Sequence, residues 1–501
     1  MRYLKLLALT TLLPLLVTSL TAQNKNKRSS LWFVYGDVDI KPLYTDVKPV
    51  CDCSALAKTS IPNTVIVSTS ADSTTRTCRI MAIVNHPPAR DSVKVWIALP
   101  LNSWNGRFQG TGGGGFLGGS PLLMSEAIKQ GFATGSTNTG HDGGSGSFAL
   151  DSNRSLNWQL IRDNAYLGIH DMTIVGKELT KTFYGKPAKY CYFVGGSTGG
   201  RQALSEAQRF PEDYDGILCL FPATNWDRFL TADLWPQVAM YESGNYISAA
   251  RLTAINKAVV QAVDQNDGLL DSVINDPIHL QFDPKALVGK TIGGNIFTEK
   301  DAEAIRKIWE GPRTAEGKFL WYGLLPGTDM TALGGTKGNP LGGSPFNITT
   351  DWVRYFLKSD PNWQGIPLSR NDFQLLWNQS VEQYHDVFGT DNSDLSAFRD
   401  RKGKLLILHG LSDQLIPPQG TIEYYQRVQT KMGGAKKTAE FVRLFLLPGL
   451  DHGLAGNGPK PINHFASLVS WVEEGKAPEL IHAELRDKSN NVVRSVSYKP
   501  F

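Results

Sequence analysis

The chain has 501 residues, of which 41% are hydrophobic and 20% charged, with a formal net charge of +4. This composition is that of an ordinary globular protein, and the length is enough for one large domain and a second, smaller one. The sequence has no basic run and no stripe of alternating basic and aromatic residues. The composition therefore argues against nucleic acid as a partner.

The first residues have the pattern of a signal peptide. A positively charged start precedes an apolar run over 6–20, and Ala22 supplies a small residue for cleavage. The alternative is an N-terminal anchor helix, which Pro14 and the shortness of the run disfavour. We expect residues 1–22 to be removed and the protein to be secreted or periplasmic. No later apolar run has membrane-spanning length, so we expect no membrane partner after cleavage.

Five cysteines, an odd number, leave at least one thiol unpaired within the monomer. Export makes disulfides possible. Either Cys53 or Cys51 could pair with Cys78 and clip the N-terminal strands together. Cys191 and Cys219 stand in apolar runs and are expected to be small buried core residues.

The first part of the chain alternates between strand and helix patterns. Short β-rich segments come first, and a long segment with helical spacing of apolar residues then leads into a strand, a helix and a further strand. In chain order these expected elements are strands 64–68, 78–84 and 93–98, helix 158–183, strand 190–194, helix 201–209 and strand 216–221. Such alternation predicts an α/β fold with a parallel sheet and helices on its faces.

The alternation stops at Pro222 and resumes near Asp394. The intervening segment is rich in aromatic residues, Gly and Pro. The pattern resumes as strand 405–408, helix 422–431, strand 441–447 and helix 462–474. We therefore expect an α/β domain over 23–224 and 395–501, interrupted by an inserted domain, here called the lid, over 225–394.

The sequence Gly195-Gly196-Ser197-Thr198-Gly199 fits the G-x-S-x-G pattern. It lies between an expected strand and an expected helix, the context in which such a serine is a nucleophile on a sharp turn. The backbone N–H of Thr198 would then point at the developing oxyanion, aided by the helix N-terminus. The alternatives are a tight turn that only allows close packing, or an anion-binding loop.

A serine nucleophile needs a base, and in this fold the chain order is serine, acid, histidine. Asp413 and His452 follow two successive expected strands and satisfy that order after Ser197. His409 precedes the acid and is expected to be a structural loop residue, while Asp451 is expected to form a turn. The order predicts that Asp413 orients His452, which takes the proton of Ser197.

A glycine-rich loop over 110–119 follows an expected short strand. We expect this loop to supply the second oxyanion donor, and Gly113 and Gly114 are the residues chosen within it. The alternatives are a phosphate-binding loop or a plain flexible turn. The loop lacks the Gly-Lys-Ser/Thr ending of a P-loop.

An acidic loop lies inside the expected lid. Asp264, Asp267 and Asp271 could supply carboxylates, and Leu269 and Val273 carbonyl oxygens, to Ca²⁺. The loop lacks the spacing of an EF-hand, so its residues alone fit a solvated turn as well as an ion site.

These motifs together resemble the tannase and feruloyl esterase family, α/β-hydrolases with a lid. The resemblance extends in order from Cys51 to the C-terminus. Its blocks are LPLNSWNGRF with GTGGGGFLGG, GSTGGRQ with FPEDYDG, GKL with HGLSD and IPP, and GLDH.

The resemblance implies a serine carboxylic ester hydrolase that cleaves esters of hydroxycinnamic, gallic or related aromatic acids. A feruloyl esterase-like activity is favoured, with a tannase or a terephthalate half-ester hydrolase as alternatives. The substrate would be a small aromatic ester or an ester linked to a plant polymer. A non-enzymatic alternative is a calcium-dependent carbohydrate-binding protein on an inactive hydrolase scaffold. The resemblance also implies a structural Ca²⁺ on the acidic loop and no cofactor for catalysis.

The chain departs from the family pattern at one pair of positions. Many members have a cysteine just before the serine and another just after the histidine, joined as a disulfide. Gly196 and Gly453 stand there in this chain. A disulfide typically contributes about 2–4 kcal/mol, so other packing must hold the site together.

Overall fold

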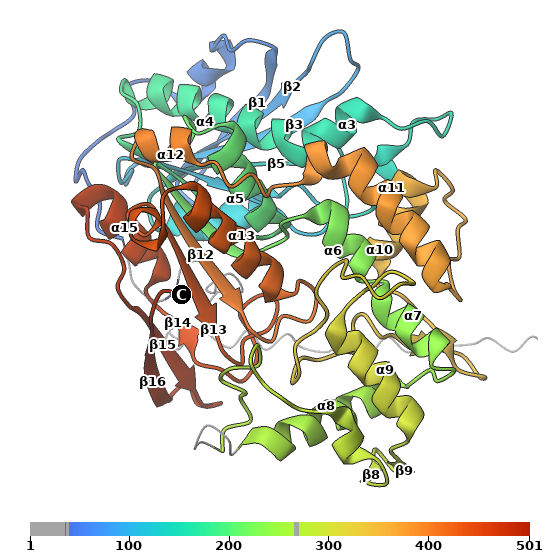
Figure 1. Ribbon diagram of the computed structural model, residues 1–501. Helices are drawn as coiled ribbons and strands as arrows, with labels where there is room; N and C mark the ends of the chain where they lie inside the picture. Colours follow the sequence, from blue (N-terminus) through green and yellow to red (C-terminus); the bar gives the residue numbers. More distant parts are fainter. Residues whose placement is uncertain (1–35, 37–39, 265–269) are drawn as a thin grey trace, which may run out of the picture.

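The computed structural model describes residues 36, 40–264 and 270–501. Its centre is a nine-stranded mixed sheet in the order β1-β2-β3-β5-β4-β6-β7-β12-β13 (Figure 1). The first three strands are antiparallel to their neighbours, and the strands from β5 onward run parallel. The strands are β1 (Thr64–Asp72), β2 (Thr77–Val84), β3 (Val93–Pro100), β4 (Arg107–Thr111), β5 (Ala133–Thr137), β6 (Tyr190–Ser197), β7 (Gly216–Pro222), β12 (Lys404–Gly410) and β13 (Val442–Leu447).

Helices cover both faces of this sheet. Apolar residues of α4 (Gly168–Tyr184), α5 (Thr198–Arg209) and α13 (Pro418–Lys431) form one core cluster, and those of α2 (Ser125–Lys129) and α15 (His464–Glu474) form another. Along β6, Phe193 joins the first cluster, while Tyr192 and Val194 join the second. Alternate side chains of a strand point to opposite faces, so β6 is buried on both sides. The α/β layering expected from the sequence is present.

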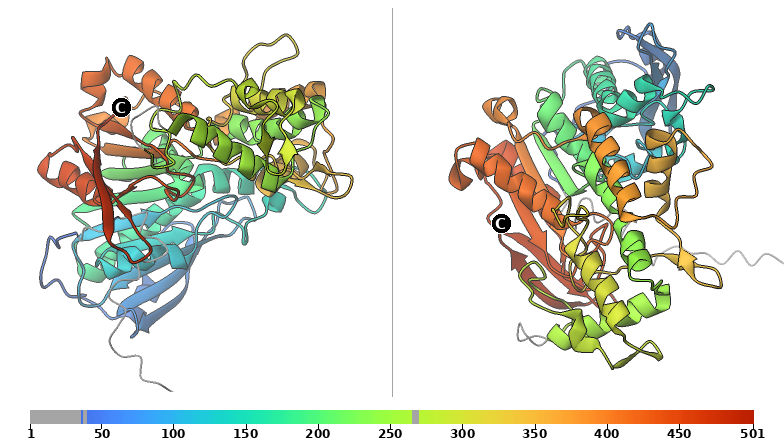
Figure 2. Two further views of the ribbon diagram at one scale, coloured as in Figure 1. Left: turned by 90° about the horizontal axis from the view of Figure 1, so that it is seen from below. Right: turned by 45° about the vertical axis from the view of Figure 1, so that its right-hand side comes forward.

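The segment between β7 and β12 forms the lid, which projects from one end of the sheet (Figures 1 and 2). Its aromatic side chains, centred on Trp226, Trp352 and Phe388, pack into one core cluster together with Phe116 and Phe148 of the segment before the lid. A second cluster joins the helices farthest from the sheet. The lid helices are α6 (Trp226–Ala232), α7 (Trp235–Glu242), α8 (Ala249–Val263), α9 (Glu299–Glu310), α10 (Asn347–Asp351), the π-helical turn η7 (Trp352–Leu357) and α11 (Arg370–Phe388).

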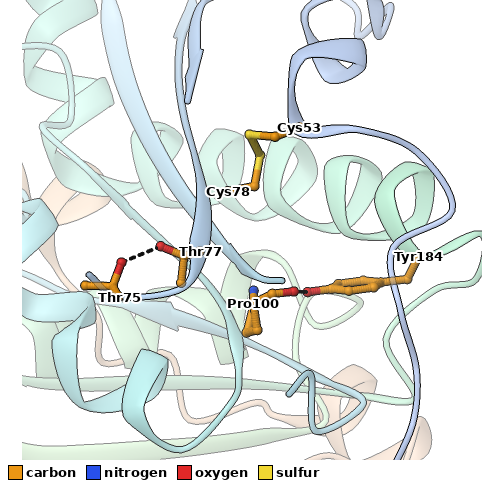
Figure 3. Close-up of a disulfide and its surroundings, with 6 residues drawn as sticks. All are labelled: Cys53, Thr75, Thr77, Cys78, Pro100 and Tyr184. Atoms are coloured by element: carbon orange, nitrogen blue, oxygen red, sulfur yellow. Dashed lines mark hydrogen bonds between the residues drawn. A yellow bond between two sulfur atoms is a disulfide. The ribbon is translucent and has the colours of Figure 1, made fainter. Parts of the chain in front are cut away.

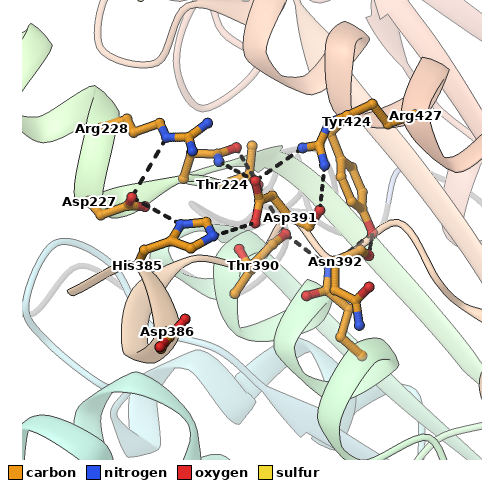
Figure 4. A network of polar contacts seen from close by, with 12 residues as sticks. Thr224, Asp227, Arg228, His385, Asp386, Thr390, Asp391, Asn392, Tyr424 and Arg427 are labelled. Carbon is orange, nitrogen blue, oxygen red and sulfur yellow. Dashed lines mark hydrogen bonds and ion pairs between the residues drawn. The ribbon is translucent and has the colours of Figure 1, made fainter. Parts of the chain in front are cut away.

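Polar contacts join the two chain segments that connect the lid to the sheet (Figure 4). Thr224 donates from Oγ1 to the carbonyl of Thr390 at 3.1 Å, and the Asn225 amide donates to Asp391 Oδ2 at 2.8 Å. Arg427 of α13 also binds Asp391, with its Nη2 3.1 Å from Oδ2. The entry and exit of the lid are therefore fixed to each other and to the catalytic domain.

A disulfide joins Cys53 to Cys78, with the Cα atoms 5.5 Å apart (Figure 3). Of the two pairings left open by the sequence, the structure has this one. It links the short helix η1 (Cys53–Lys58) to β2. Cys191 and Cys219 are buried free thiols, as expected.

The helix expected over 158–183 is interrupted. It consists of α3 (Trp158–Arg162), the π-helical turn η4 (Asp163–Leu167) and α4. The buried guanidinium of Arg201 donates to the carbonyls of Asn164 and Ala165, at 3.1 and 2.6 Å. These carbonyls face α5, and the regular helical ladder gives way at this turn.

A three-stranded sheet near the C-terminus has no counterpart among the expected elements. It comprises β14 (Lys460–Pro461), β15 (Ile481–Arg486) and β16 (Val492–Tyr498). Among the described helices, none combines the length and the apolar character needed to cross a bilayer. The predicted signal peptide lies outside the described residues.

Candidate active site

Ser197 is the last residue of β6 and stands immediately before α5. Its backbone has φ 60° and ψ −122°, a conformation that costs energy for any residue with a side chain. The carbonyl of Ser197 accepts from the N–H of Ala223, so the turn is anchored to the entry of the lid. The strained strand-to-helix turn is the geometry that exposes a serine hydroxyl above the sheet edge.

Asp413 and His452 meet on the loops that follow β12 and β13. His452 Nδ1 lies 3.0 Å from Asp413 Oδ2 and 3.1 Å from Oδ1. The Asp413 side chain is fully buried, and its Oδ1 also accepts from the backbone N–H groups of Leu415 and Ile416, both at 2.9 Å. The carboxylate is therefore fixed, and it can hold the imidazole in one orientation and one tautomer.

His409, expected to be a structural loop residue, contacts the same carboxylate. Its Nε2 lies 3.2 Å from Asp413 Oδ2, and its Nδ1 lies 2.9 Å from the hydroxyl oxygen of Thr421. Burial alone would raise the pKa of Asp413, but His452 and His409 together hold that pKa well below its ordinary value. Asp413 is thus ionised. The sequence signal for this second contact of Asp413 is the presence of a histidine four residues before it.

The glycine loop packs against the first turn of α5. Thr198 donates from Oγ1 to the carbonyl of Gly115 at 2.6 Å, and the N–H of Gly199 donates to the carbonyl of Gly113 at 3.0 Å. The loop is therefore held beside the residue that follows Ser197, where the sequence places an oxyanion hole.

The two amides expected to bind the oxyanion already have acceptors in this structure. The N–H of Gly113 donates to Gln202 Oε1 at 2.9 Å, and that of Gly114 donates to the carbonyl of Leu117 at 3.0 Å. Both bonds would have to open before these groups could serve an oxyanion.

Phe221 fills the space between the serine turn and the histidine. A Cβ atom added at Gly196 would lie 2.4 Å from Cζ of this ring, far inside contact distance. The same ring packs edge-on against His452, with centroids 4.9 Å apart. Phe221 therefore lies beside Gly196, one of the two positions at which the family pattern has a cysteine.

Comparisons with known proteins identify a family of esterases, which agrees with this geometry. The model of the family described as tannase and feruloyl esterase matches residues 78–499. A probable feruloyl esterase of Arthroderma benhamiae is 37% identical over 469 residues, which cover 87% of each chain.

The chain belongs to the tannase and feruloyl esterase family.

Other members and solved structures agree with that membership. Feruloyl esterase B of Aspergillus niger is 32% identical over 403 residues, covering 76% of this chain and 74% of the relative. The crystal structure of feruloyl esterase B from Aspergillus oryzae superimposes with a TM-score of 0.79 at 26% identity, covering 90% and 96% of the two chains. Tannin acyl hydrolase from Aspergillus niger shares the fold, with a TM-score of 0.81 at 22% identity. The expected α/β-hydrolase fold is confirmed, and this family member is a carboxylic ester hydrolase.

Part of the predicted calcium loop of this esterase lies within the described residues, while Asp267 and Leu269 lie outside them. Asp264 is buried, and its Oδ1 has no hydrogen-bond partner among the described residues. Asp271 Oδ1 accepts from the N–H of Val273 at 3.0 Å, and its Oδ2 contacts Arg494 of β16. The Asp264 oxygen fits a cation ligand, whereas Asp271 would have to share its carboxylate with Arg494.

A second group of metal-ligating residues lies away from the triad. One ligand atom each of His86, Asp91 and Asp163 lie within 4.8 Å of one another. His86 Nδ1 is 2.6 Å from Asp91 Oδ2, and its Nε2 is 3.3 Å from Asp171 Oδ2. The contact with Asp171, opposed by partial burial, raises the pKa of His86 to about 9. In this structure the His86 imidazolium therefore forms ion pairs with the carboxylates of Asp91 and Asp171.

Proposed function

We propose that the protein hydrolyses esters of hydroxycinnamic and related aromatic acids, with feruloyl esters preferred, through an acyl-enzyme formed on Ser197. The observation that carries the proposal is the contact between His452 Nδ1 and the buried carboxylate of Asp413, at 3.0 Å. These two residues lie on the loops that follow neighbouring strands, and Ser197 lies in a strained turn at the end of another strand of the same sheet. The relatives named as feruloyl esterases support the choice of acid.

In this mechanism His452 accepts the Ser197 hydroxyl proton as the serine oxygen attacks the ester carbonyl. The carbonyl oxygen becomes an oxyanion, and the first amide of α5, the N–H of Thr198, donates to it. His452 then gives its proton to the departing alcohol, which leaves an acyl-serine. A water molecule then attacks the acyl carbon as His452 takes its proton, and His452 passes that proton to the Ser197 oxygen as the acid leaves. Asp413 stays ionised throughout and stabilises the imidazolium.

The glycine loop completes the proposed oxyanion hole. Gly113 and Gly114 remain the residues proposed for the second donor, with the condition that substrate binding opens their present bonds to Gln202 and Leu117. Thr198 Oγ1 holds the loop through Gly115, so the first and second donors would move as one unit. The aromatic lid is proposed to stack on the acyl group.

A structural Ca²⁺ is proposed for the lid loop, with Asp264, Asp267 and Asp271 as carboxylate ligands and Leu269 and Val273 as carbonyl ligands. The buried, unpartnered oxygen of Asp264 supports it. The ion would stiffen the loop and take no part in the chemistry. Residues 1–22 are proposed as a cleaved signal peptide that directs export.

The substrate proposal is tested by comparing kcat/KM for methyl ferulate, methyl gallate and mono-hydroxyethyl terephthalate on the purified mature protein. We expect the highest value for methyl ferulate. A ten-fold preference for the gallate ester would establish a tannase instead, and a ten-fold preference for the terephthalate ester a half-ester hydrolase. Hydrolysis of none of the three would overturn the proposed function.

A further inference from the structure

A cluster of one histidine and three carboxylates joins the connection between β2 and β3 to the segment formed by η4 and α4. His86 and Asp91 stand in the connection between the two strands, Asp163 is the first residue of η4, and Asp171 lies in the first turn of α4. Asp91 and Asp163 are buried, while 23% of the His86 side chain is exposed. Water and small ions can therefore reach the cluster on the side of His86.

The cluster has an excess of negative charge. Among the described residues, His86 is the only basic side chain that forms ion pairs with Asp91, Asp163 or Asp171. Asp163 is fully buried, and its Oδ2 has no hydrogen-bond partner in the part of the chain that the structure describes. Leaving a buried carboxylate oxygen without a partner costs free energy, which a bound cation would recover.

The spacing of the ligand atoms suits a small transition-metal ion. One ligand atom each of His86, Asp91 and Asp163 lie within 4.8 Å of one another. Tetrahedral Zn²⁺, with bonds of about 2.0–2.2 Å, holds its ligand atoms roughly 3.3–3.6 Å apart. His86 Nδ1 lies 3.6 Å from Asp163 Oδ1, which fits this spacing, and 2.6 Å from Asp91 Oδ2. The second distance is that of a hydrogen bond, so it would lengthen when an ion entered.

The other ring nitrogen of His86 has the partner that a metal-bound histidine uses. His86 Nε2 lies 3.3 Å from Asp171 Oδ2, so the imidazole can donate to this carboxylate while Nδ1 binds an ion. The backbone N–H of His86 donates to Asp91 Oδ1 at 2.9 Å, and Gln159 Nε2 donates to Asp163 Oδ1 at 2.7 Å, so both carboxylates are held in place. An imidazole ligand favours Zn²⁺, whereas Ca²⁺ prefers oxygen ligands alone.

We propose that His86 Nδ1 and the carboxylates of Asp91 and Asp163 bind Zn²⁺. The ion displaces the proton of His86 Nδ1 to solvent, and a water molecule on the exposed side of the histidine completes the tetrahedron. The bound ion fastens the connection between β2 and β3 to η4. Asn164, which follows Asp163, donates from Nδ2 to the carbonyl of Phe116 at 3.1 Å, so the ion also stiffens the support of the glycine loop.

Calorimetric titration of Zn²⁺ into the purified protein tests the proposal. The protein is first stripped with EDTA and dialysed, and it is then saturated with Ca²⁺, which fills the proposed lid site. Starting every metal titration from stripped protein keeps the effects of the two ions apart. We expect one equivalent of Zn²⁺ to bind and to raise the melting temperature, because the ion binds the folded state.

Two variants remove ligands, and a third provides the matched control. Asp163→Asn removes a ligand charge and His86→Gln removes the nitrogen ligand, and each should weaken Zn²⁺ binding at least ten-fold. His279 forms an exposed pair with Asp276, with Nδ1 2.8 Å from Oδ2. His279→Gln removes a histidine from this pair, and it should keep the wild-type affinity for Zn²⁺.

Asp171→Asn and a direct location of the ion keep the test decisive if a ligand variant folds poorly. Loss of the outer partner of a metal-bound histidine should lower the affinity by about 10–100-fold. Anomalous diffraction at the zinc edge locates the ion in the wild type, and an ion on His86, Asp91 and Asp163 supports the proposal. No Zn²⁺ binding, undiminished binding in both ligand variants, or an ion found only elsewhere would overturn it. None of these outcomes depends on ester hydrolysis, so the proposed function can fail separately.

Discussion

The ring of Phe221 stands edge-on to the imidazole of His452, with the ring centroids 4.9 Å apart. The same ring lies over Gly196, the residue before Ser197. One side chain therefore lies against both His452 and the turn at Ser197, in the region where the family pattern described above places a disulfide. Apolar packing can supply a stabilisation of similar size to that of the cross-link, because burying a Phe side chain contributes about 1.5–3 kcal/mol.

Gly196→Ala should destabilise the protein, because the new methyl group would lie 2.4 Å from the Phe221 ring. Overpacking of this kind costs about 1–3 kcal/mol in free energy of unfolding. Adding Phe221→Leu, which shortens the side chain, should recover part of the loss, and chemical denaturation of the single and double variants measures the coupling. Gly144→Ala is the matched control, since a Cβ there meets no atom within 4 Å. Additive effects of the two changes would show that Phe221 does not fill this space.

Asp413→Asn should lower kcat for methyl ferulate by about 10⁴, the loss measured when a triad aspartate becomes an amide and the histidine adopts the wrong tautomer. Among the described residues, the buried Asp413 carboxylate is the acceptor that lies within hydrogen-bonding distance of His452 Nδ1. Asp400→Asn makes the same chemical change at an exposed position and should leave kcat at the wild-type value. A loss below ten-fold in Asp413→Asn would assign the acid to another residue.

His385 should stabilise the lid connections in a pH-dependent way. Its Nδ1 lies 3.2 Å from Asp227 Oδ2 and its Nε2 3.7 Å from Asp391 Oδ1 (Figure 4). The contact with Asp227 raises the pKa of His385 above its ordinary value. The stabilisation is therefore complete below the unfolded pKa of about 6.5 and is lost as the pH rises through the folded pKa.

The stability difference between wild type and His385→Gln should accordingly be larger at pH 6 than at pH 9.5, as measured by urea denaturation. Asp227→Asn removes the carboxylate partner, and in that background His385→Gln should show a smaller pH dependence. An equal difference at both pH values would mean that the ion pair contributes nothing to the lid connections.

Removal of calcium should lower the melting temperature. An ion that binds only the folded state stabilises it by about 2.7 kcal/mol at a concentration of 100 Kd. Differential scanning calorimetry with EDTA and with excess CaCl₂ measures the effect, and Asp264→Asn should abolish the difference. Equal melting temperatures of the wild type in both buffers would contradict the proposed calcium site.

The sequence predicts those parts of the fold that depend on local pattern. Strand and helix spacing place β6, α5, β7 and β12 within a few residues, and the order of Ser197, Asp413 and His452 along the chain is enough to nominate a triad. Local patterns do not contain the contacts made by Phe221 and His409, because each depends on loops that are distant in sequence meeting at the sheet edge. The interruption at Asp163–Leu167 is of the same kind, since it follows from two carbonyls turned toward Arg201 of another helix.

The most direct measurement is the kcat of Ser197→Ala for methyl ferulate. Replacing a triad serine costs about 10⁶ in kcat when the three residues act as a unit. Ser205→Ala removes a buried hydroxyl from α5, the helix that follows Ser197, and controls for the substitution itself. We predict a loss of about 10⁶ for Ser197→Ala with an unchanged melting temperature, and activity near that of the wild type would contradict the assignment of Ser197 as the nucleophile.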